Sequence, residues 1–169
     1  SCRLSPGLKF GRMGHPPVGS GLIGLPETKL GLIPGWAEQF RDAFGRDSGG
    51  LIHAYHTQDA ETIVVALGSV LGTIKDTVDE LRATGSRIGV LGITCFRPWP
   101  AAAIRAALAG AKRVVVVEKS LAVGLGGIVS ANVRTSFEGP PDTVHTVVAG
   151  LGGRSITRQA LARVFTAAA

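Results

Sequence analysis

The stretch IVVALGSVLGTIKDTVDEL, residues 63–81, places a strand pattern and a helix pattern in direct succession. An apolar run ends at Gly68, and from Leu71 onward apolar residues recur at i, i+3, i+7 and i+10, the spacing of one helix face. A strand that leads straight into a helix is the repeating unit of a parallel α/β sheet. Because backbone N–H groups and the helix dipole favour an anion at such a turn, this stretch is also a candidate binding site.

The same alternation of strand and helix patterns continues through the rest of the chain. Apolar runs predict strands at residues 51–56, 62–67, 88–94, 113–119 and 145–151. Helical spacing predicts helices at residues 71–84, 101–110, within 124–137 and at 157–168, the last with Thr157 as its N-cap. The turn between the first two strands is too short for a parallel crossover, so the first strand is expected to lie antiparallel or elsewhere at the sheet edge. The sequence therefore predicts a three-layer α/β/α sandwich with a five-stranded, mostly parallel sheet and an antiparallel edge strand.

The N-terminal quarter of the chain has a different pattern. Residues 1 to about 35 are rich in glycine and proline and their apolar residues follow no clear period, which is typical of an irregular arm or linker. One face of a short helix follows, with apolar residues at i, i+4 and i+8: Trp36, Phe40 and Phe44. We therefore expect an irregular arm with a short helix over residues 1–44, and one α/β domain over residues 45–169.

The composition excludes several classes of protein. Apolar residues make up 45% of the 169 residues and charged residues 18%, which is typical of a globular protein. No apolar run approaches the roughly 18 residues that span a bilayer, and the N-terminal residues contain no stretch typical of a signal peptide. The net charge of +6 comes largely from scattered arginines and aromatic residues are only 5%, whereas nucleic-acid binding usually needs clustered basic residues with exposed aromatics. We expect a cytoplasmic protein that binds neither membrane nor nucleic acid.

No catalytic or metal-binding pattern is present in the sequence. Cys2 and Cys95 are too few for an iron–sulfur cluster and too far apart for a zinc site. His53 and His56 are expected on opposite faces of a strand, which makes them poor partners for one metal. Glu118 ends the fourth strand, where parallel sheets commonly place functional side chains, but it has no base, nucleophile or second carboxylate near it in sequence. The sequence therefore predicts no catalytic residue and no metal site.

Three glycine turns remain as weak candidates for an anion site. The spacing in GSVLG matches neither the dinucleotide fingerprint nor the P-loop, so a turn with Ser69 as helix N-cap is favoured over an anion nest. GLGGIVS comes closer to the fingerprint, but Val129 stands where a third small residue is needed. Arg154, after the last strand, could bind an anion or lie at an interface. The candidate residues are Gly68, Ser69, Gly126, Gly127 and Arg154.

Three motifs, taken together, are similar to those of a known family. They are YHTQDAETIVVALGS (55–69), FRPWP (96–100) and GLGGR (150–154). In this order and spacing they resemble the 2-oxoacid:ferredoxin oxidoreductases, and most of all the second domain of pyruvate:ferredoxin oxidoreductase, which belongs to the α subunit where the chains are split. The resemblance covers roughly residues 45–165. It departs from the family at Glu118 and Lys119, where relatives often carry an aspartate–arginine pair, and the family's preceding domain is missing.

The resemblance implies a fold like the transketolase C-terminal domain. It also implies an enzyme that uses thiamine diphosphate and iron–sulfur clusters to decarboxylate a 2-oxoacid oxidatively, forms acyl-coenzyme A and reduces ferredoxin. In such enzymes this domain mainly organises contacts between subunits and domains, while other parts hold the cofactors. It thus implies a structural or assembly role, no cofactor bound by this chain, and partners that are the enzyme's other subunits or domains, with ferredoxin reached through the complex.

Two other functions remain open from the sequence. The glycine turns and the basic charge are compatible with a free-standing small α/β protein that binds a nucleotide or another anion. A non-catalytic interaction module that has lost its enzyme is the third hypothesis.

Overall fold

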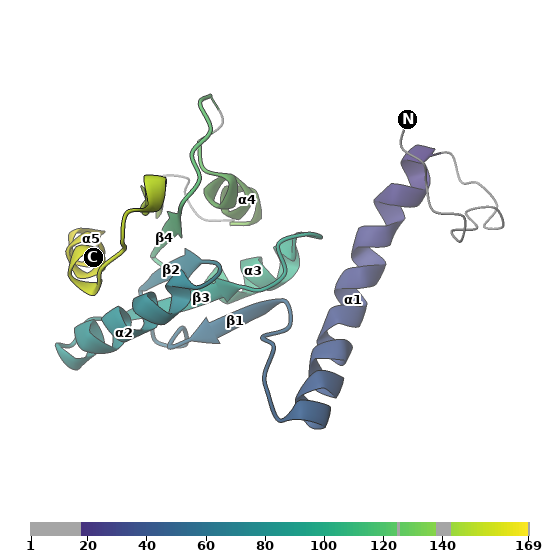
Figure 1. Ribbon diagram of the computed structural model, residues 1–169, viewed down its shortest axis with the longest axis horizontal. Coiled ribbons are helices and arrows are strands. Elements are labelled where there is room, and N and C mark those ends of the chain that lie inside the picture. The colour runs from purple at the N-terminus through teal and green to yellow at the C-terminus, as the bar shows by residue number, and fades with distance from the viewer. Residues whose placement is uncertain (1–17, 125, 138–142, 169) are drawn as a thin grey trace.

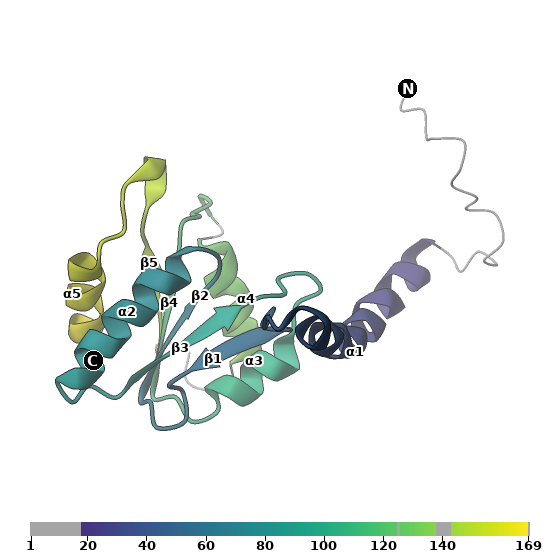
Figure 2. The same cartoon turned by 60° about the horizontal axis from the view of Figure 1, so that its bottom comes forward.

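The computed structural model describes residues 18–124, 126–137 and 143–168. Its centre is a five-stranded sheet of order β1-β3-β2-β4-β5, covered by helices on both faces (Figure 1, Figure 2). The strands are β1 (Ile52–Tyr55), β2 (Thr62–Ala66), β3 (Ile88–Ile93), β4 (Arg113–Glu118) and β5 (Val144–Val148). The helices are α1 (Val18–Phe44), α2 (Val70–Ala83), α3 (Ala101–Leu108), α4 (Ile128–Ser136) and α5 (Arg158–Ala168), with a 3-10 helix, η2 (Leu151–Gly153), before α5. The predicted three-layer α/β/α sandwich is confirmed.

The order of the strands creates a switch point in the middle of the sheet. β2 pairs in parallel with both β3 and β4, and β4 pairs in parallel with β5. β1 pairs antiparallel with β3, with Ile52 opposite Ile93, so the predicted antiparallel edge strand is confirmed. The chain passes from β3 across β2 to β4, and the direction of winding therefore reverses between β2 and β4.

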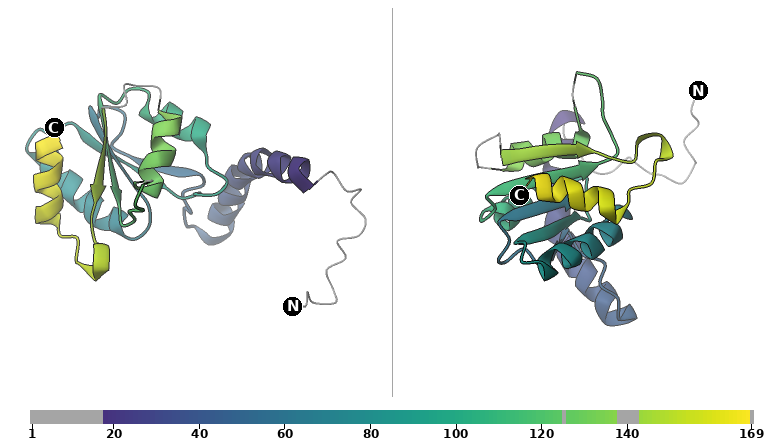
Figure 3. Two further views of the ribbon diagram at one scale, coloured as in Figure 1. Left: turned by 90° about the horizontal axis from the view of Figure 1, so that it is seen from above. Right: turned by 90° about the vertical axis from the view of Figure 1, so that its left-hand side faces the viewer.

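The helices lie on both faces of the sheet (Figure 3), and an apolar cluster joins them to each face. On one face, Ile63 and Val65 of β2 pack in the cluster that α3 and α4 cover, whereas Val64 faces the cluster that α2 and α5 cover. Every residue of β2 is buried, as expected for a central strand covered on both sides. α5 begins at its predicted N-cap, where Thr157 Oγ1 accepts a hydrogen bond of 3.2 Å from the N–H of Ala160.

α1 is longer than the sequence pattern predicts. It is one 27-residue helix that extends away from the sandwich, and Pro26 and Pro34 lie within it. The prediction of irregular backbone is wrong for residues 18–35; residues 1–17 lie outside the described residues. Glycine and proline weaken a helix without forbidding it, and the i, i+4 stripe of Trp36 continues upstream to Leu32. The division into an arm and a domain at residue 45 stays a prediction.

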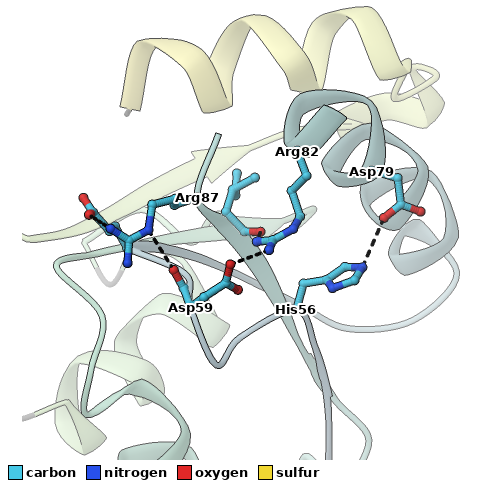
Figure 4. Close-up of polar contacts among 7 residues, drawn as sticks. His56, Asp59, Asp79, Arg82 and Arg87 are labelled. Carbon is cyan, nitrogen blue, oxygen red and sulfur yellow. Dashed lines mark hydrogen bonds and ion pairs between the residues drawn. The ribbon is translucent and has the colours of Figure 1, made fainter. Parts of the chain in front are cut away.

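Ion pairs close the end of the sheet where the parallel strands begin. We call this the amino edge; it comprises the loops that precede β2, β3 and β4, residues 56–61, 84–87 and 109–112. Arg82 joins the first of these loops to the start of β3, because its guanidinium donates to Asp59 Oδ2 at 2.6 Å and to the carbonyl oxygen of Ile88 at 2.9 Å (Figure 4). Hydrogen bonding to Arg82 lowers the pKa of Asp59. The backbone carbonyl of Asp59 also accepts a bond of 3.1 Å from Arg87 Nε.

Glu61 extends this network to the third loop. Its carboxylate lies 3.2 Å from Lys112 Nζ and 2.7 Å from Arg87 Nη1. The hydrogen bond and charge of Lys112 lower the pKa of Glu61, and the charge of Arg87 adds to the effect. The acidic residues of the first family-like motif therefore serve to connect loops.

The aromatic residues of the same motif fix the end of β1. The Tyr55 hydroxyl donates to the carboxylate of Asp79 at 2.9 Å, which raises the pKa of the phenol. His56 follows the strand with a left-handed φ of 52°, and its Nε2 lies 3.5 Å from Asp79 Oδ1. A Cβ at Gly89 would collide with the carbonyl group of His56, so glycine is needed there for the close approach of two backbones.

Candidate functional site

The candidate site lies at the opposite end of the sheet, where the parallel strands finish. We call this the carboxyl edge; it comprises the loops after β2, β3, β4 and β5, residues 67–69, 94–100, 119–127 and 149–157. Open α/β sheets commonly bind ligands at this end, where the strand order reverses. A pocket of about 320 Å³ occupies that position here, with Gly68 and Ser69 on one wall and Glu118 and Lys119 on the other.

The turn after β2 confirms one part of its predicted role and corrects another. Gly68 has a φ of 79°, and the space where its Cβ would point is open, so glycine is needed there for backbone conformation alone. Ser69 stands at the N-cap position of α2, but its hydroxyl makes no capping hydrogen bond. The predicted side-chain cap is wrong because Ser69 already has helical dihedral angles, whereas a capping side chain normally starts from extended backbone.

The turn before α4 binds a carboxylate of the chain itself. Glu118 is only 6% exposed, and its Oε2 and Oε1 accept hydrogen bonds of 2.9 and 3.1 Å from the N–H groups of Val129 and Ser130. A Cβ at Gly127 would collide with this carboxylate. The anion that a helix N-terminus favours is therefore supplied internally, and Gly127 makes room for it.

This contact is the feature that sequence reasoning missed. Glu118 lies 11 and 12 residues before its two donors, beyond the range in which a sequence pattern indicates a cap. The available signal was an acidic residue at a strand end followed by a Gly-Gly pair just before a helix.

The structure does not bring the five anion candidates into one site. Gly68 and Ser69 line the central pocket. Gly126 and Gly127 line a separate hollow of about 370 Å³ beside Arg134. Arg154 lines neither of these two and is exposed after η2. Lys119, which was not among the candidates, is brought to the turn after β2 because β2 and β4 are neighbours in the sheet.

The two remaining family-like motifs lie at this edge. In FRPWP, the indole N–H of Trp99 donates to Ser136 Oγ at 2.7 Å, which ties the loop after β3 to α4. In GLGGR, all three glycines have left-handed φ values between 64° and 78°; Gly150 precedes η2 and the other two lie within it, and Leu151 at its start is half exposed. The first of these motifs stabilises the fold, whereas the second presents side chains to solvent.

The described residues do not fit an iron–sulfur cluster. They contain no group of three or more His, Cys, Asp or Glu side chains that could hold a metal ion. Cys95 is the sole cysteine among them, and its Sγ donates to the carbonyl oxygen of Pro98 at 3.3 Å. In the same part of the chain, no helix combines the length and apolarity needed to cross a membrane.

Comparison with known proteins identifies the family. Residues 60–161 match the family described as pyruvate:ferredoxin oxidoreductase core domain II. The pyruvate synthase subunit PorA of Methanosarcina barkeri (strain Fusaro / DSM 804) is 38% identical over 141 residues, which cover 82% of this chain and 35% of that relative. This chain spans about a third of the length of the first curated relatives it matches.

Solved structures share the fold. A 2-oxoglutarate:ferredoxin oxidoreductase from Magnetococcus marinus superposes with a TM-score of 0.60 and 18% identity, over 99% of this chain and 27% of that chain. A split-gene transketolase superposes with a TM-score of 0.52 and 20% identity, over 66% of this chain and 39% of that chain, so the expected transketolase-like fold is confirmed. The chain belongs to the 2-oxoacid:ferredoxin oxidoreductase family, and its residues 60–161 correspond to core domain II of pyruvate:ferredoxin oxidoreductase.

Proposed function

We propose that this chain is a structural and assembly domain of a thiamine-diphosphate-dependent 2-oxoacid:ferredoxin oxidoreductase, with pyruvate as the 2-oxoacid. The observation that carries the proposal is that the Glu118 carboxylate binds the N-terminus of α4. Among the described residues Glu118 is the one buried ionisable side chain, and both of its carboxylate oxygens accept bonds from the start of α4. The residue best placed for acid–base chemistry is thus committed to holding the edge of the sheet together.

The cofactors of the complete enzyme would then be held elsewhere. That enzyme would use thiamine diphosphate, iron–sulfur clusters and coenzyme A in the cytoplasm, and it would reduce ferredoxin. The cysteine content does not fit a cluster, and the helix N-terminus of α4, which could have bound a diphosphate, already holds a carboxylate. This chain would contribute contacts to the enzyme's other subunits or domains, and no group that reacts.

An activity measurement tests this role. Purified chain alone is expected to show no 2-oxoacid-dependent reduction of a viologen dye. The same assay on the complete enzyme, assembled with and without residues 1–169, should show activity and a stable complex only when they are present. Robust turnover by the isolated chain would overturn the proposal.

The central pocket supports one alternative function, that of a free-standing α/β protein that binds a nucleotide or another anion. The pocket lies at the switch point of the sheet, and Lys119 could attract an anion there. A ligand at about 100 times its dissociation constant stabilises the folded state by roughly 2.7 kcal/mol. Thermal melts with millimolar NAD, FAD, ATP, coenzyme A and thiamine diphosphate are expected to show no shift beyond that of equal ionic strength. A shift with one ligand that Ser69→Ala abolishes would favour this alternative.

A further inference from the structure

Exposed apolar side chains gather in two places. Among residues 30–124, 126–137 and 143–168, whose side chains the structure describes, nine large apolar residues are exposed, four of them on α1. The other five lie in the carboxyl-edge loops or at the first residue after them: Leu67, Leu121, Val123, Ile128 and Leu151. Figure 2 shows that the loop after β4 and the η2 segment both project beyond the sheet at this end. None of the nine lies at the amino edge, so outside α1 the apolar exposure is confined to one end of the sheet.

The four carboxyl-edge loops carry cations and no carboxylate, and the segment before β1 that reaches the same end of the sheet adds one charge of each sign, Arg46 and Asp47. The four carboxyl-edge loops contain Arg97, Lys119 and Arg154 and no acidic residue. Glu118 adjoins them, but it is buried against α4. Among the described residues, neither Lys119 nor Arg154 has an ion-pair partner. The edge therefore combines exposed apolar side chains with cations that no carboxylate of the described chain neutralises.

This combination points to a protein partner. Exposed apolar side chains that cluster with charged groups around them are characteristic of interaction sites. A symmetric contact with a second copy would place cations against cations, which disfavours association. A small anion in the central pocket would leave Leu121, Val123 and Leu151 exposed, because none of them lines it, and the helix N-terminus of α4 is already occupied by Glu118.

We propose that the carboxyl edge docks against an apolar protein surface that carries exposed carboxylates, located in another chain or domain of the oxidoreductase. The inference rests on the proposed function for the identity of the assembly, but the chemistry of the partner surface follows from the edge itself. Leu121, Val123 and Leu151 enter the apolar centre of the contact, and Lys119 and Arg154 pair with the carboxylates at its rim.

Zero-length cross-linking tests the partner's chemistry directly. A carbodiimide joins an amine to a carboxylate that touches it, and it would be applied to the natively purified enzyme complex. Lys112 Nζ lies 3.2 Å from Glu61 Oε2, so the Lys112–Glu61 link within the chain is the internal positive control. We expect Lys119 to be linked to an Asp or Glu in a peptide outside residues 1–169. A link from Lys119 into a second copy of residues 1–169, or a Lys119 that stays free to acetylation in the complex, would overturn the proposal.

Matched variants test the apolar and charged parts separately. Val123→Glu and Arg154→Glu should each weaken retention of the partner in the complex about tenfold or more. Arg163→Glu, on the exposed side of α5, is the control of equal charge change and should retain the partner as the wild type does. Thermal melting of each isolated variant shows whether the fold is intact.

The outcomes separate this proposal from the one on which it rests. If the wild-type chain is absent from the purified oxidoreductase, the proposed function fails. If it is present and both edge variants are retained like Arg163→Glu, only the docking surface is wrong. Protection of Lys119 from acetylation in the isolated chain by millimolar ATP or coenzyme A would assign the edge to a small ligand and contradict a protein partner.

Discussion

The two ends of the sheet differ in whether their charged side chains form ion pairs within the chain. At the amino edge, Asp59 and Glu61 each contact basic side chains of the same chain, so the loops are joined to one another. At the carboxyl edge, Lys119 and Arg154 have no such carboxylate in the described chain, and the fully exposed Val123 belongs to the same loop as Lys119. Ion pairs within the chain stabilise the fold at the amino edge. Unpaired cations beside exposed apolar side chains suit the carboxyl edge to contact with a protein partner.

The largest expected effect concerns the one internal carboxylate of the carboxyl edge. Glu118→Ala should lower the free energy of unfolding by about 3 kcal/mol, because two buried N–H groups lose their acceptor and the helix N-terminus loses its anion. Urea denaturation followed by circular dichroism measures this loss. An unchanged midpoint would mean that the carboxylate is not what holds this edge, and the contrast between the edges would lose its structural basis.

A double-mutant cycle sharpens the assignment. Gly127→Ala should cost about 2 kcal/mol or more, since the new methyl group collides with the Glu118 carboxylate. In the Glu118→Ala background the same substitution should cost at least 1 kcal/mol less, because the colliding group is gone. Strictly additive losses would contradict direct contact between the turn and the carboxylate.

At the amino edge, Arg82→Ala should lower the free energy of unfolding by about 1 to 2 kcal/mol. Most of this loss comes from the partly buried carbonyl group of Ile88, which would lose its donor. Arg163→Ala on α5, where the arginine is exposed and forms no ion pair with the described residues, should stay within about 0.5 kcal/mol of the wild type. If the two variants unfold alike, the ion pairs of the amino edge do not stabilise the fold.

The same edge should make the protein sensitive to acid. The pKa values of Asp59 and Glu61 are lowered in the folded state, so the folded state binds fewer protons than the unfolded one. The stabilisation is present above the unfolded pKa values and is lost as the pH falls through the folded ones. Melting temperatures measured from about pH 6 to pH 3 should therefore fall, and Asp59→Asn should flatten the decline. The effect is modest because both side chains contact water.

Most of the fold could be predicted from the sequence because its strands are buried and its helices are regular. The alternation from residue 51 onward identified each strand that the structure describes, and the short turn after β1 indicated the antiparallel edge. α1 could not be predicted in full, because Pro26 and Pro34 are local signals of irregular structure, and a local signal does not show whether the chain tolerates them within a helix.

The candidate site was predicted less completely, because its contacts join parts that are distant in sequence. Gly68 requires only its own backbone conformation, and the pattern of a strand followed by a glycine and a helix indicated it. Lys119 reaches the same pocket only because β2 and β4 are neighbours, and the order of strands in a sheet is not written in local periodicity. The contrast between the edges likewise emerges only when loops from four strands are brought together.

The smallest expected effect on the isolated chain belongs to the tip of the loop after β4. Val123 is 105% exposed, so it buries no surface in this chain, and Val123→Ser should change the free energy of unfolding by less than about 0.5 kcal/mol. Val65→Ser is the matched control, since Val65 is fully buried in β2 and a hydroxyl there would lose apolar contacts and gain no assured partner. Urea titrations of both variants measure the difference. A marked loss of stability for Val123→Ser would mean that this side chain already packs within the chain. The carboxyl edge would then, like the amino edge, contact only its own chain, and the contrast between the two edges would fail.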